Sequence, residues 1–303
     1  MPTATVAHAE ALQYLRALPS ASVDAVITDP PYPCIDREYG RWTEAEWFAL
    51  MDPLVEECRR VLTPTGSAVF ILQPNSERVG RMRTWLWEFM AKWGREWGIV
   101  QDAYWWNVCA MPEAHSIQGR LLRASLKNCV WMGSPDCHRD QDAVLWGEAE
   151  STSAYRQYDR AMKRVAFPSG HGVNRATVMN AADRRGGVSP MNVIPCGNDK
   201  LGGMQGHGAA TPRTLCQWWV RYICPPGGTV LDPFSGSGTV QLAALAEGRN
   251  AIGCERMEKY VQIARRRIAE FQTPPPPKPP RPAWPIDFGD LDPGHYTALF
   301  AGE

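Results

Sequence analysis

The chain has 303 residues, of which 44% are hydrophobic and 21% charged, as is typical of a globular protein with a sizeable core. Its 32 Lys and Arg residues balance 32 Asp and Glu residues, so any phosphate-binding surface must come from local clustering. No apolar run reaches the roughly 18 residues of a membrane span, and no secretion signal opens the chain, so we expect no membrane partner and a cytoplasmic location.

The first half of the chain alternates strand and helix patterns. The predicted elements are a strand at residues 23–28, a helix at 44–62, a strand at 67–72, a tryptophan-rich helix at 81–97 and a strand-like stretch at 99–106. Strands that alternate with helices in this order favour a parallel sheet covered by helices.

This pattern dissolves at about residue 135, where Gly, Ser, Asn and Arg become frequent, and we interpret residues 135–190 as a loop-rich insert. Order then returns in the predicted helix at 215–223, strand at 229–231, helix at 239–247, strand at 251–253 and helix at 260–271. The proline-rich segment that follows is typical of a polyproline linker.

Nine cysteines, an odd number, are scattered along the chain without a C-x-x-C pair. Cys137-His138 has no second half at metal-ligand spacing, so we expect no metal site. We predict that the thiols are reduced and buried as small apolar side chains.

A glycine-rich turn joins the predicted strand at 229–231 to the next helix. Its residues include Asp232, Pro233, Phe234, Gly236, Gly238 and Thr239. Glycines let the backbone approach a ligand closely, and a helix N-terminus favours an anionic group. Glu255, at the end of the following strand, is placed to bind ribose hydroxyls. The spacing alone does not separate a dinucleotide from S-adenosylmethionine, and it also permits a purely structural turn.

The tetrapeptide Asp29-Pro30-Pro31-Tyr32 directly follows the strand at residues 23–28. Its two prolines stiffen the loop and remove backbone donors, so the Asp29 carboxylate and the neighbouring carbonyls become fixed acceptors. Such acceptors suit an amino group, whose two hydrogens need partners, and Tyr32 offers a flat face for a base. Taken alone, the tetrapeptide is also compatible with a plain turn.

Together, the two motifs resemble those of the DNA amino-methyltransferases of the permuted β group, in which D-P-P-Y precedes the recognition insert and F-x-G-x-G follows it. The likeness extends to residues 9–28, 61–67, 211–215 and 248–255, and it covers roughly residues 9–134 and 190–270. It implies the circularly permuted, Rossmann-like α/β fold of the S-adenosylmethionine-dependent methyltransferases, with a loop-rich target-recognition insert.

The resemblance divides the chain into a catalytic half at residues 1–134, the recognition insert at 135–190, a cofactor-binding half at 191–272 and a proline-rich tail at 273–303. Two positions depart from the family pattern. Glu10 stands where the family usually has an aspartate near the adenine of the cofactor. Thr211-Pro212 stands where it usually has Lys-Pro, so a backbone contact of Pro212 to the cofactor would survive, whereas a lysine side-chain contact would not.

The resemblance also implies roles for individual residues. The cofactor, S-adenosylmethionine, would be bound by Asp232, Pro233, Phe234, Gly236, Gly238, Thr239, Glu255, Glu10 and Pro212. Catalysis would fall to Asp29, Pro30, Pro31 and Tyr32. Asp29 and the Pro30 carbonyl would accept the two amino hydrogens, and Tyr32 would hold a base that has flipped out of the duplex. The two loops must then be neighbours, although they lie about 200 residues apart.

Double-stranded DNA is the expected substrate. We expect methylation of adenine N6 rather than cytosine N4, because cytosine-N4 members more often carry serine at the position of Asp29. Sequence recognition is expected in the insert, whose candidate DNA contacts are Arg156, Arg160, Lys163, Arg164 and Arg175. A homodimer and a cognate restriction endonuclease stay open as further partners.

Three other interpretations stay open as well. An RNA methyltransferase shares the fold and even the tetrapeptide, although the permuted order and the long insert favour DNA. A catalytically silent DNA-binding protein would be expected to carry a damaged motif, and both motifs are intact. The glycine-rich turn alone permits a nicotinamide enzyme, in which D-P-P-Y would have no role.

Overall fold

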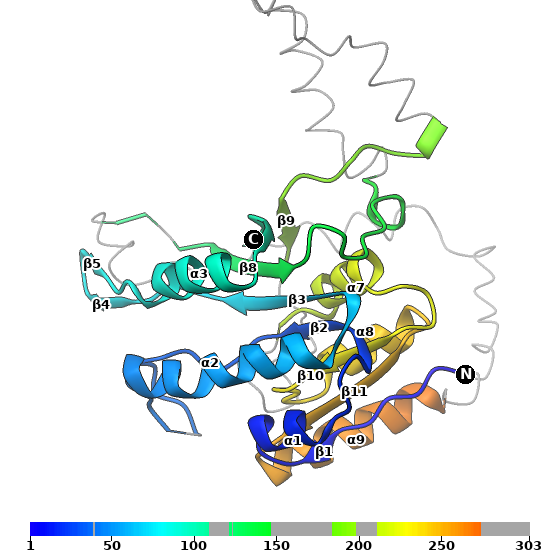
Figure 1. Cartoon of the computed structure of the whole chain (residues 1–303), viewed down its shortest axis with the longest axis horizontal. Coiled ribbons are helices and arrows are strands. Elements are labelled where there is room, and N and C mark those ends of the chain that lie inside the picture. Colours follow the sequence, from blue (N-terminus) through cyan, green and yellow to red (C-terminus); the bar gives the residue numbers. More distant parts are fainter. Residues whose placement is uncertain (39, 109–120, 123, 147–183, 198–210, 274–303) are drawn as a thin grey trace, which may run out of the picture.

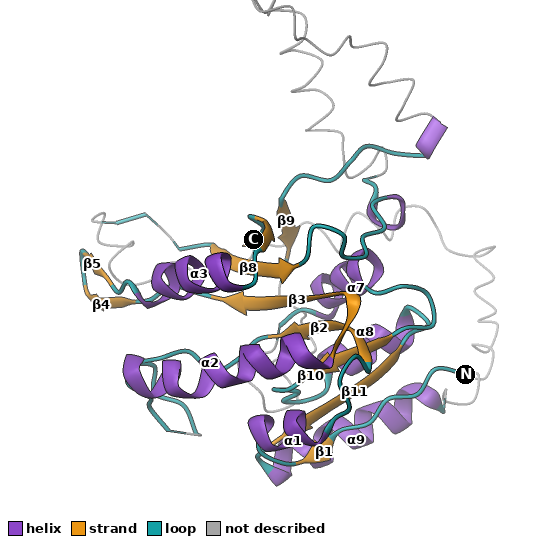
Figure 2. Cartoon of the chain, viewed as in Figure 1, coloured by secondary structure: helices purple, strands orange, loops and turns teal. Residues whose placement is uncertain are grey.

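A computed structural model describes residues 1–38, 40–108, 121–122, 124–146, 184–197 and 211–273 of the chain. In this part, nine strands form a central sheet with helices on both faces (Figures 1 and 2). The strands lie side by side in the order β1 (Ala7–His8), β11 (Asn250–Glu255), β10 (Thr229–Asp232), β2 (Val23–Thr28), β3 (Leu62–Leu72), β8 (Leu126–Gly133), β7 (Tyr104–Asn107) and β9 (Val193–Cys196), with β6 (Ile99–Gln101) also paired to β8.

The sheet is parallel over its first five strands and mixed beyond them. Neighbouring strands from β1 to β3 pair in parallel, which confirms the predicted βα alternation there. β8 is antiparallel to β3, and β7 is antiparallel to β8 but parallel to β9. The expected parallel sheet is therefore confirmed from β1 to β3 and wrong at this end. The single stretch expected at residues 99–106 is two strands, β6 and β7, which both pair with β8.

Among the described helices, three cover one face of the sheet and two cover the other (Figure 1). The first face carries α1 (Ala11–Ala17), α2 (Glu44–Val61) and α3 (Trp85–Glu96). The second carries α7 (Arg213–Ile223) and α8 (Thr239–Ala246), and α9 (Glu258–Gln272) packs beside α8. α3 is shorter than predicted because residues 81–82 belong to a small hairpin of β4 (Ser76–Arg78) and β5 (Arg81–Met82). A short 3-10 turn, η1 (Asp142–Val144), completes the described elements.

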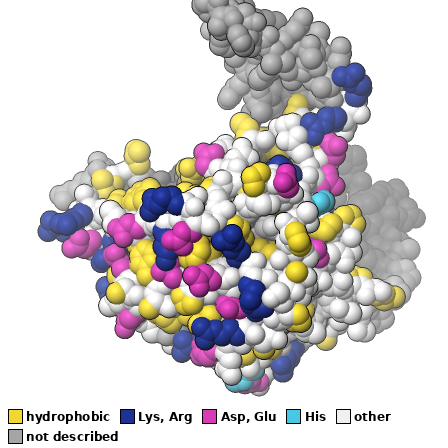
Figure 3. Space-filling model, in the orientation of Figure 1, with side chains coloured by type: hydrophobic (Ala, Val, Ile, Leu, Met, Phe, Trp, Pro, Cys, Tyr) yellow, Lys and Arg dark blue, Asp and Glu magenta, His cyan; other side chains and the backbone are white. Residues whose placement is uncertain are grey.

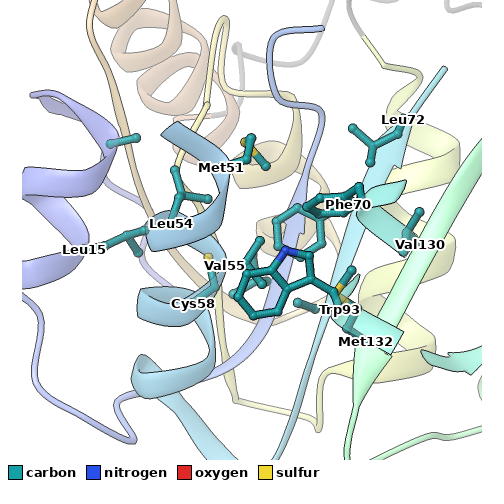
Figure 4. Close-up of a cluster of buried hydrophobic side chains, with 14 of the residues drawn as sticks. Leu15, Met51, Leu54, Val55, Cys58, Phe70, Leu72, Trp93, Val130 and Met132 are labelled. Carbon is teal, nitrogen blue, oxygen red and sulfur yellow. The ribbon is translucent and has the colours of Figure 1, made fainter. Parts of the chain in front are cut away.

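The middle strands bury side chains on both faces. Along β3, Ala68, Phe70 and Leu72 pack into the cluster under α2, whereas Val69 and Ile71 pack into the cluster under α7. Figure 4 shows the first cluster, where side chains of α1, α2 and α3 meet those of β3 and β8. A strand that is covered on both faces needs apolar residues at every position, which explains its continuous apolar run.

α2 begins at a reciprocal cap. The Thr43 hydroxyl accepts a hydrogen bond from the Glu46 amide at 3.2 Å, and the Glu46 carboxylate accepts one from the Thr43 amide at 2.7 Å. The cap fixes the first turn of the helix, which carries Trp47 into the core, where its side chain is fully buried. This indole reaches the functional site described below.

Six of the eight cysteines in the described ranges are buried free thiols, as the sequence predicted. Burial raises the pKa of Cys129 and of Cys224 to about 12, so both thiols stay protonated at neutral pH and are poor nucleophiles. Within the same ranges, no helix is long and apolar enough to cross a membrane. No three His, Cys, Asp or Glu side chains of the described residues gather as metal ligands would.

Candidate active site

A cavity of about 830 Å³ opens at the carboxyl ends of the parallel strands, a size typical of small-ligand sites. The D-P-P-Y loop (residues 29–32) follows β2 and lines one part of it. The glycine-rich loop (residues 232–239) follows β10 and lines another. The sequence predicted that these loops meet, and the structure confirms it. The carboxyl edge of an open α/β sheet is also where ligands bind in such folds.

The two loops are joined through Thr28, the last residue of β2. Its hydroxyl donates a hydrogen bond to Asp232 Oδ1 at 2.7 Å, and both side chains are buried. The strands behind them are in direct register, with Ala25 opposite Val230 and Val26 opposite Leu231. Segments about 200 residues apart in sequence are therefore held together by a sheet ladder and a buried side-chain bond.

Two hydrogen bonds and one further polar contact anchor the D-P-P-Y loop and the residue after it. Trp47 Nε1 donates to the Pro31 carbonyl at 2.7 Å, and the Asn75 side chain donates to the Pro33 carbonyl at 2.6 Å. The Tyr32 hydroxyl oxygen also lies 3.2 Å from the Ile71 carbonyl oxygen. Because these partners belong to α2, to β3 and to the segment that follows β3, the loop is fixed by the core of the protein as well as by its prolines.

Both carboxylate oxygens of Asp29 accept a hydrogen bond. The Tyr32 hydroxyl donates to Oδ1 at 2.5 Å, and the Thr211 hydroxyl donates to Oδ2 at 2.6 Å. The ammonium of Lys127, on β8, lies 3.7 Å from Oδ2. A carboxylate offers about four acceptor sites, so Asp29 is oriented by the two hydroxyls and can still accept hydrogens from a ligand. Its side chain is 22% exposed and faces the cavity.

Tyr32 lies between the cavity and the aromatic core. Its ring stacks loosely on Trp85, with centroids 6.5 Å apart and 28° between the planes. Trp85 in turn meets Trp47 edge to face at 4.7 Å. This backing fixes the plane of the tyrosine, which the sequence assigned as a stacking surface for a base.

Asp232, the last residue of β10, is hydrogen-bonded to the glycine-rich loop that follows it. Its side chain is 3% exposed, and Oδ1 accepts from the Phe234 amide at 3.0 Å in addition to the Thr28 hydroxyl. Burial raises the pKa of Asp232 to about 7, although the two hydrogen bonds act in the opposite direction. The sequence predicted a cofactor contact for Asp232, and the structure places it at the cavity wall, where Oδ1 accepts from the end of β2 and from the glycine-rich loop.

Gly253 makes room for the glycine-rich loop. It lies opposite Asp232 in the ladder between β10 and β11, and a Cβ there would come within 2.3 Å of the Asp232 carbonyl oxygen. That same oxygen accepts from the Ser235 hydroxyl at 2.9 Å, and Gln241 donates to this hydroxyl at 2.8 Å. Gly238, which caps α8, has a positive φ of 80°, a conformation that favours glycine.

Glu255 ends β11 beside the glycine-rich loop, where the sequence predicted a ribose ligand. Its carboxylate accepts from the Gly236 amide at 3.1 Å and from the Met257 amide at 2.8 Å. Glu10 also lines the cavity and lies 3.8 Å from the Arg256 guanidinium. These contacts leave lone pairs on both carboxylates available to a ligand.

The structure places other predicted residues as follows. Pro30, Pro31, Pro233, Phe234, Gly236 and Thr239 line the cavity. Pro212 is buried at the start of α7 and is not among the lining residues, whereas its neighbour Thr211 is. The candidate DNA contacts Arg156, Arg160, Lys163, Arg164 and Arg175 lie outside the described residues, as does most of the insert. On the face shown in Figure 3, basic and acidic side chains are interspersed, in line with the balanced net charge.

Sequence reasoning missed several residues of the site. Thr28, Trp47, Lys127 and Gly253 act through contacts with segments far away in the sequence. Lys127 lies on β8, for which we had predicted no strand. A run of apolar residues from Cys129 to Met132 was the one local signal that could have revealed it.

A family model described as DNA methylase matches residues 23–266 of the chain. The match includes β2, which leads into the D-P-P-Y loop, and extends through the glycine-rich loop into α9. It therefore spans both halves of the cavity and the segment between them.

Individual relatives agree with this match. The chain is 24% identical over 288 residues to the type II methyltransferase M.PvuII of Proteus hauseri, covering 86% of this chain and 82% of that protein. It is 24% identical over 270 residues to the DNA adenine methyltransferase YhdJ of Escherichia coli (strain K12), covering 87% of this chain and 82% of that protein.

Solved structures share the fold. The cytosine-N4-specific PvuII DNA methyltransferase superposes with a TM-score of 0.64 at 18% identity, covering 90% of this chain and 94% of that chain. The complex of M1.HpyAVI with S-adenosylmethionine superposes with a TM-score of 0.54 at 20% identity, covering 88% of this chain and 99% of that chain.

Proposed function

The chain belongs to the DNA methylase family, and from this membership and the site geometry we propose that it methylates the N6 amino group of adenine in double-stranded DNA. At the level of the family, it is a DNA methyltransferase of the adenine-N6 or cytosine-N4 class with S-adenosylmethionine as its cofactor. Beyond this family-level activity, we propose which base is methylated, that the substrate is double-stranded, and which residues carry out the reaction. The observation that carries it is the placement of Asp29 and the glycine-rich loop in one cavity.

The cavity suits the cofactor in its chemistry. The glycine-rich loop leads into the N-terminus of α8, whose amides favour a carboxylate such as that of the methionine end. Gly236 adds no side chain to the cavity wall, and Glu255 supplies acceptors for ribose hydroxyls. We assign the methionine end to the glycine-rich loop, the ribose to Glu255, and the adenine to the neighbourhood of Glu10. When bound, S-adenosylmethionine supplies an electrophilic methyl group.

The D-P-P-Y loop prepares the amino group. An exocyclic amino nitrogen is a weak nucleophile because its lone pair is delocalised into the ring. If Asp29 and the Pro30 carbonyl accept its two hydrogens, the lone pair is directed away from the ring plane. The two hydroxyl bonds on Asp29 fix this acceptor before the base arrives, so little reorganisation remains for the reaction itself.

Adenine is the proposed base because an aspartate stands at position 29. Cytosine-N4 members of the resembled family more often carry serine at this position. A carboxylate only accepts hydrogen bonds, whereas a hydroxyl also donates, so Asp29 is the stronger acceptor for an amino hydrogen. Cytosine N4 is the second candidate, because the structural relatives include the cytosine-N4-specific PvuII enzyme.

The duplex must open for either base. The amino nitrogen of a paired base lies inside the double helix, so the target nucleotide has to flip into the cavity beside Asp29 and Tyr32. Sequence recognition by the insert, a homodimer and a cognate restriction endonuclease stay predictions. Footprinting, sedimentation and co-expression would test them in turn.

Transfer of labelled methyl groups tests the proposal. The protein is incubated with methyl-labelled S-adenosylmethionine and unmodified duplex DNA, which is then digested to nucleosides for mass spectrometry. We expect label in N6-methyladenine, its loss in Asp29→Ala, and its retention in Asp102→Ala, which removes an exposed carboxylate outside the cavity. Label in N4-methylcytosine would instead identify cytosine as the target base. Absence of label from DNA despite measurable cofactor binding would overturn the proposal.

A further inference from the structure

Lys127 lines the cavity beside the D-P-P-Y loop. It is the second residue of β8 and lies directly across from Trp105 of β7 in the antiparallel ladder. Its side chain is 17% exposed, which is unusual for a lysine. Because a partly buried ammonium is costly without partners, its position must be stabilised by specific contacts.

Those contacts fix the ammonium next to the D-P-P-Y loop. Nζ lies 3.3 Å from the Tyr32 hydroxyl and 3.7 Å from Asp29 Oδ2. It also lies over the Trp105 ring, 4.9 Å from its centroid. Trp105 is 2% exposed, and its indole donates to the Cys196 carbonyl at 2.9 Å. The ammonium is thus held between the Trp105 ring and the D-P-P-Y loop, at the wall of the cavity.

From this arrangement we infer that Lys127 reads the target base, donating a hydrogen bond to the ring nitrogen beside the amino group that Asp29 holds. An ammonium has three donors and no acceptor, whereas the Asp29 carboxylate only accepts. Side by side, they form a donor–acceptor pair that faces the cavity. This inference rests on the proposed function, because it needs a flipped base in that cavity.

The pair matches one kind of Watson–Crick edge. Adenine presents its N6 amino group next to the acceptor N1, and cytosine presents its N4 amino group next to the acceptor N3. Guanine and thymine present the reverse, a carbonyl oxygen next to a ring N–H, so each would meet Asp29 and Lys127 with the wrong partner. Enzymes that act on flipped bases commonly read this edge. Lys127 would therefore select amino-bearing bases and set the ring in one orientation.

The test removes the donor and the acceptor separately and then together. The methylated sequence is first mapped on plasmid DNA that has been treated with the protein. Duplexes are then made with the target adenine intact or replaced by 1-deazaadenine, which lacks the ring acceptor; 3-deazacytosine serves if the base is cytosine. Lys127→Met removes the donor, and Lys127→Arg keeps one. Lys92→Met is the matched control, because Lys92 also lies over an indole and pairs with a carboxylate, but outside the cavity.

We expect kcat/KM to fall roughly 10- to 100-fold for Lys127→Met on natural DNA and for wild type on the analogue, as for a hydrogen bond to a charged group. The two losses should not add when both changes are combined, whereas a merely structural role for Lys127 would give additive losses. Lys127→Arg should recover part of the rate on natural DNA, and Lys92→Met should match wild type.

Two results would overturn the inference: additive losses, or an undiminished rate of wild type on the analogue. If Lys127→Met does not fold, judged by its thermal transition and cofactor affinity, the analogue series with wild type and Lys127→Arg still decides. Failure of the proposed function would look different, because wild type would then transfer no methyl group to any DNA.

Discussion

Replacement of Gly253 by alanine should weaken both the fold and cofactor binding. The added Cβ would lie 2.3 Å from the Asp232 carbonyl oxygen and 2.3 Å from the Ser235 hydroxyl, distances that no real contact reaches. The carbonyl belongs to the backbone of β10, so the strand or the glycine-rich loop must move. Any such movement displaces the loop that we assign to the methionine end of the cofactor.

The structure gives the size of this effect. Overpacking of a dense core costs about 1–3 kcal/mol. Displacement of Ser235 also weakens its 2.9 Å bond to Asp232, which adds about 1 kcal/mol. We therefore expect the free energy of unfolding to fall by about 2–4 kcal/mol in total. If the loop relieves this strain by moving in the free protein, and binding of S-adenosylmethionine restores about 1.4 kcal/mol of it, the affinity falls tenfold.

Urea denaturation and calorimetric titration with S-adenosylmethionine measure the two effects. Gly94→Ala is the matched control, because a Cβ at Gly94 on α3 would make an ordinary contact of 3.4 Å with Ile99. Alanine in place of glycine within a helix should stabilise the fold by about 0.5–1 kcal/mol. Gly94→Ala should therefore raise the free energy of unfolding, whereas Gly253→Ala should lower it. A Gly253→Ala protein within about 0.5 kcal/mol of wild type, with normal cofactor affinity, would refute this reasoning.

Three further predictions follow from the site. Asp232→Asn should be more stable than wild type above about pH 7, and this difference in stability should shrink as the pH falls toward 4. The reason is that the pKa of Asp232 is raised in the folded state, so its stabilising protonated form is lost as the pH rises. Urea titrations at pH 5, 6 and 8 measure the difference, and no trend with pH would contradict the prediction. Thr211→Val should lower kcat about tenfold and leave cofactor affinity unchanged, because Asp29 loses one of its two hydroxyl donors. An unchanged kcat would contradict the role of Thr211 in orienting Asp29. Trp47→Phe should cost about 1–3 kcal/mol of stability and lower kcat, since the Pro31 carbonyl loses its donor; equal thermal transitions for the two proteins would count against the anchor.

Local sequence signals located the two loops well. The D-P-P-Y loop and the glycine-rich loop each follow a short apolar strand, and both line the cavity. Prolines and glycines constrain the backbone within a few residues, so their positions can be interpreted without knowledge of the fold. The helix boundaries at α2, α8 and α9 also came within a few residues of those predicted.

The rest depended on tertiary contacts. The donors that orient Asp29 come from Tyr32 nearby and from Thr211, which is 182 residues away. Asp232 was expected to contact the cofactor, but its two short bonds to Thr28 and Phe234 became visible only when β2 and β10 were placed side by side. No periodicity in the sequence reports such pairings. The antiparallel end of the sheet was missed because no strand was predicted at β8, and its direction relative to β3 is set by pairing between distant segments.

The central claim is that the glycine-rich loop binds the cofactor, whereas Asp29 of the D-P-P-Y loop acts on the amino group. One paired measurement tests it most directly. Affinity for S-adenosylmethionine and single-turnover methyl transfer to unmodified duplex DNA are determined for wild type and Asp29→Ala. The account predicts that the variant binds the cofactor as wild type does but transfers methyl groups roughly 100- to 1,000-fold more slowly, the usual loss for a single preorganised polar group. A variant that transfers methyl groups at the wild-type rate, or that loses cofactor affinity as much as rate, would contradict it.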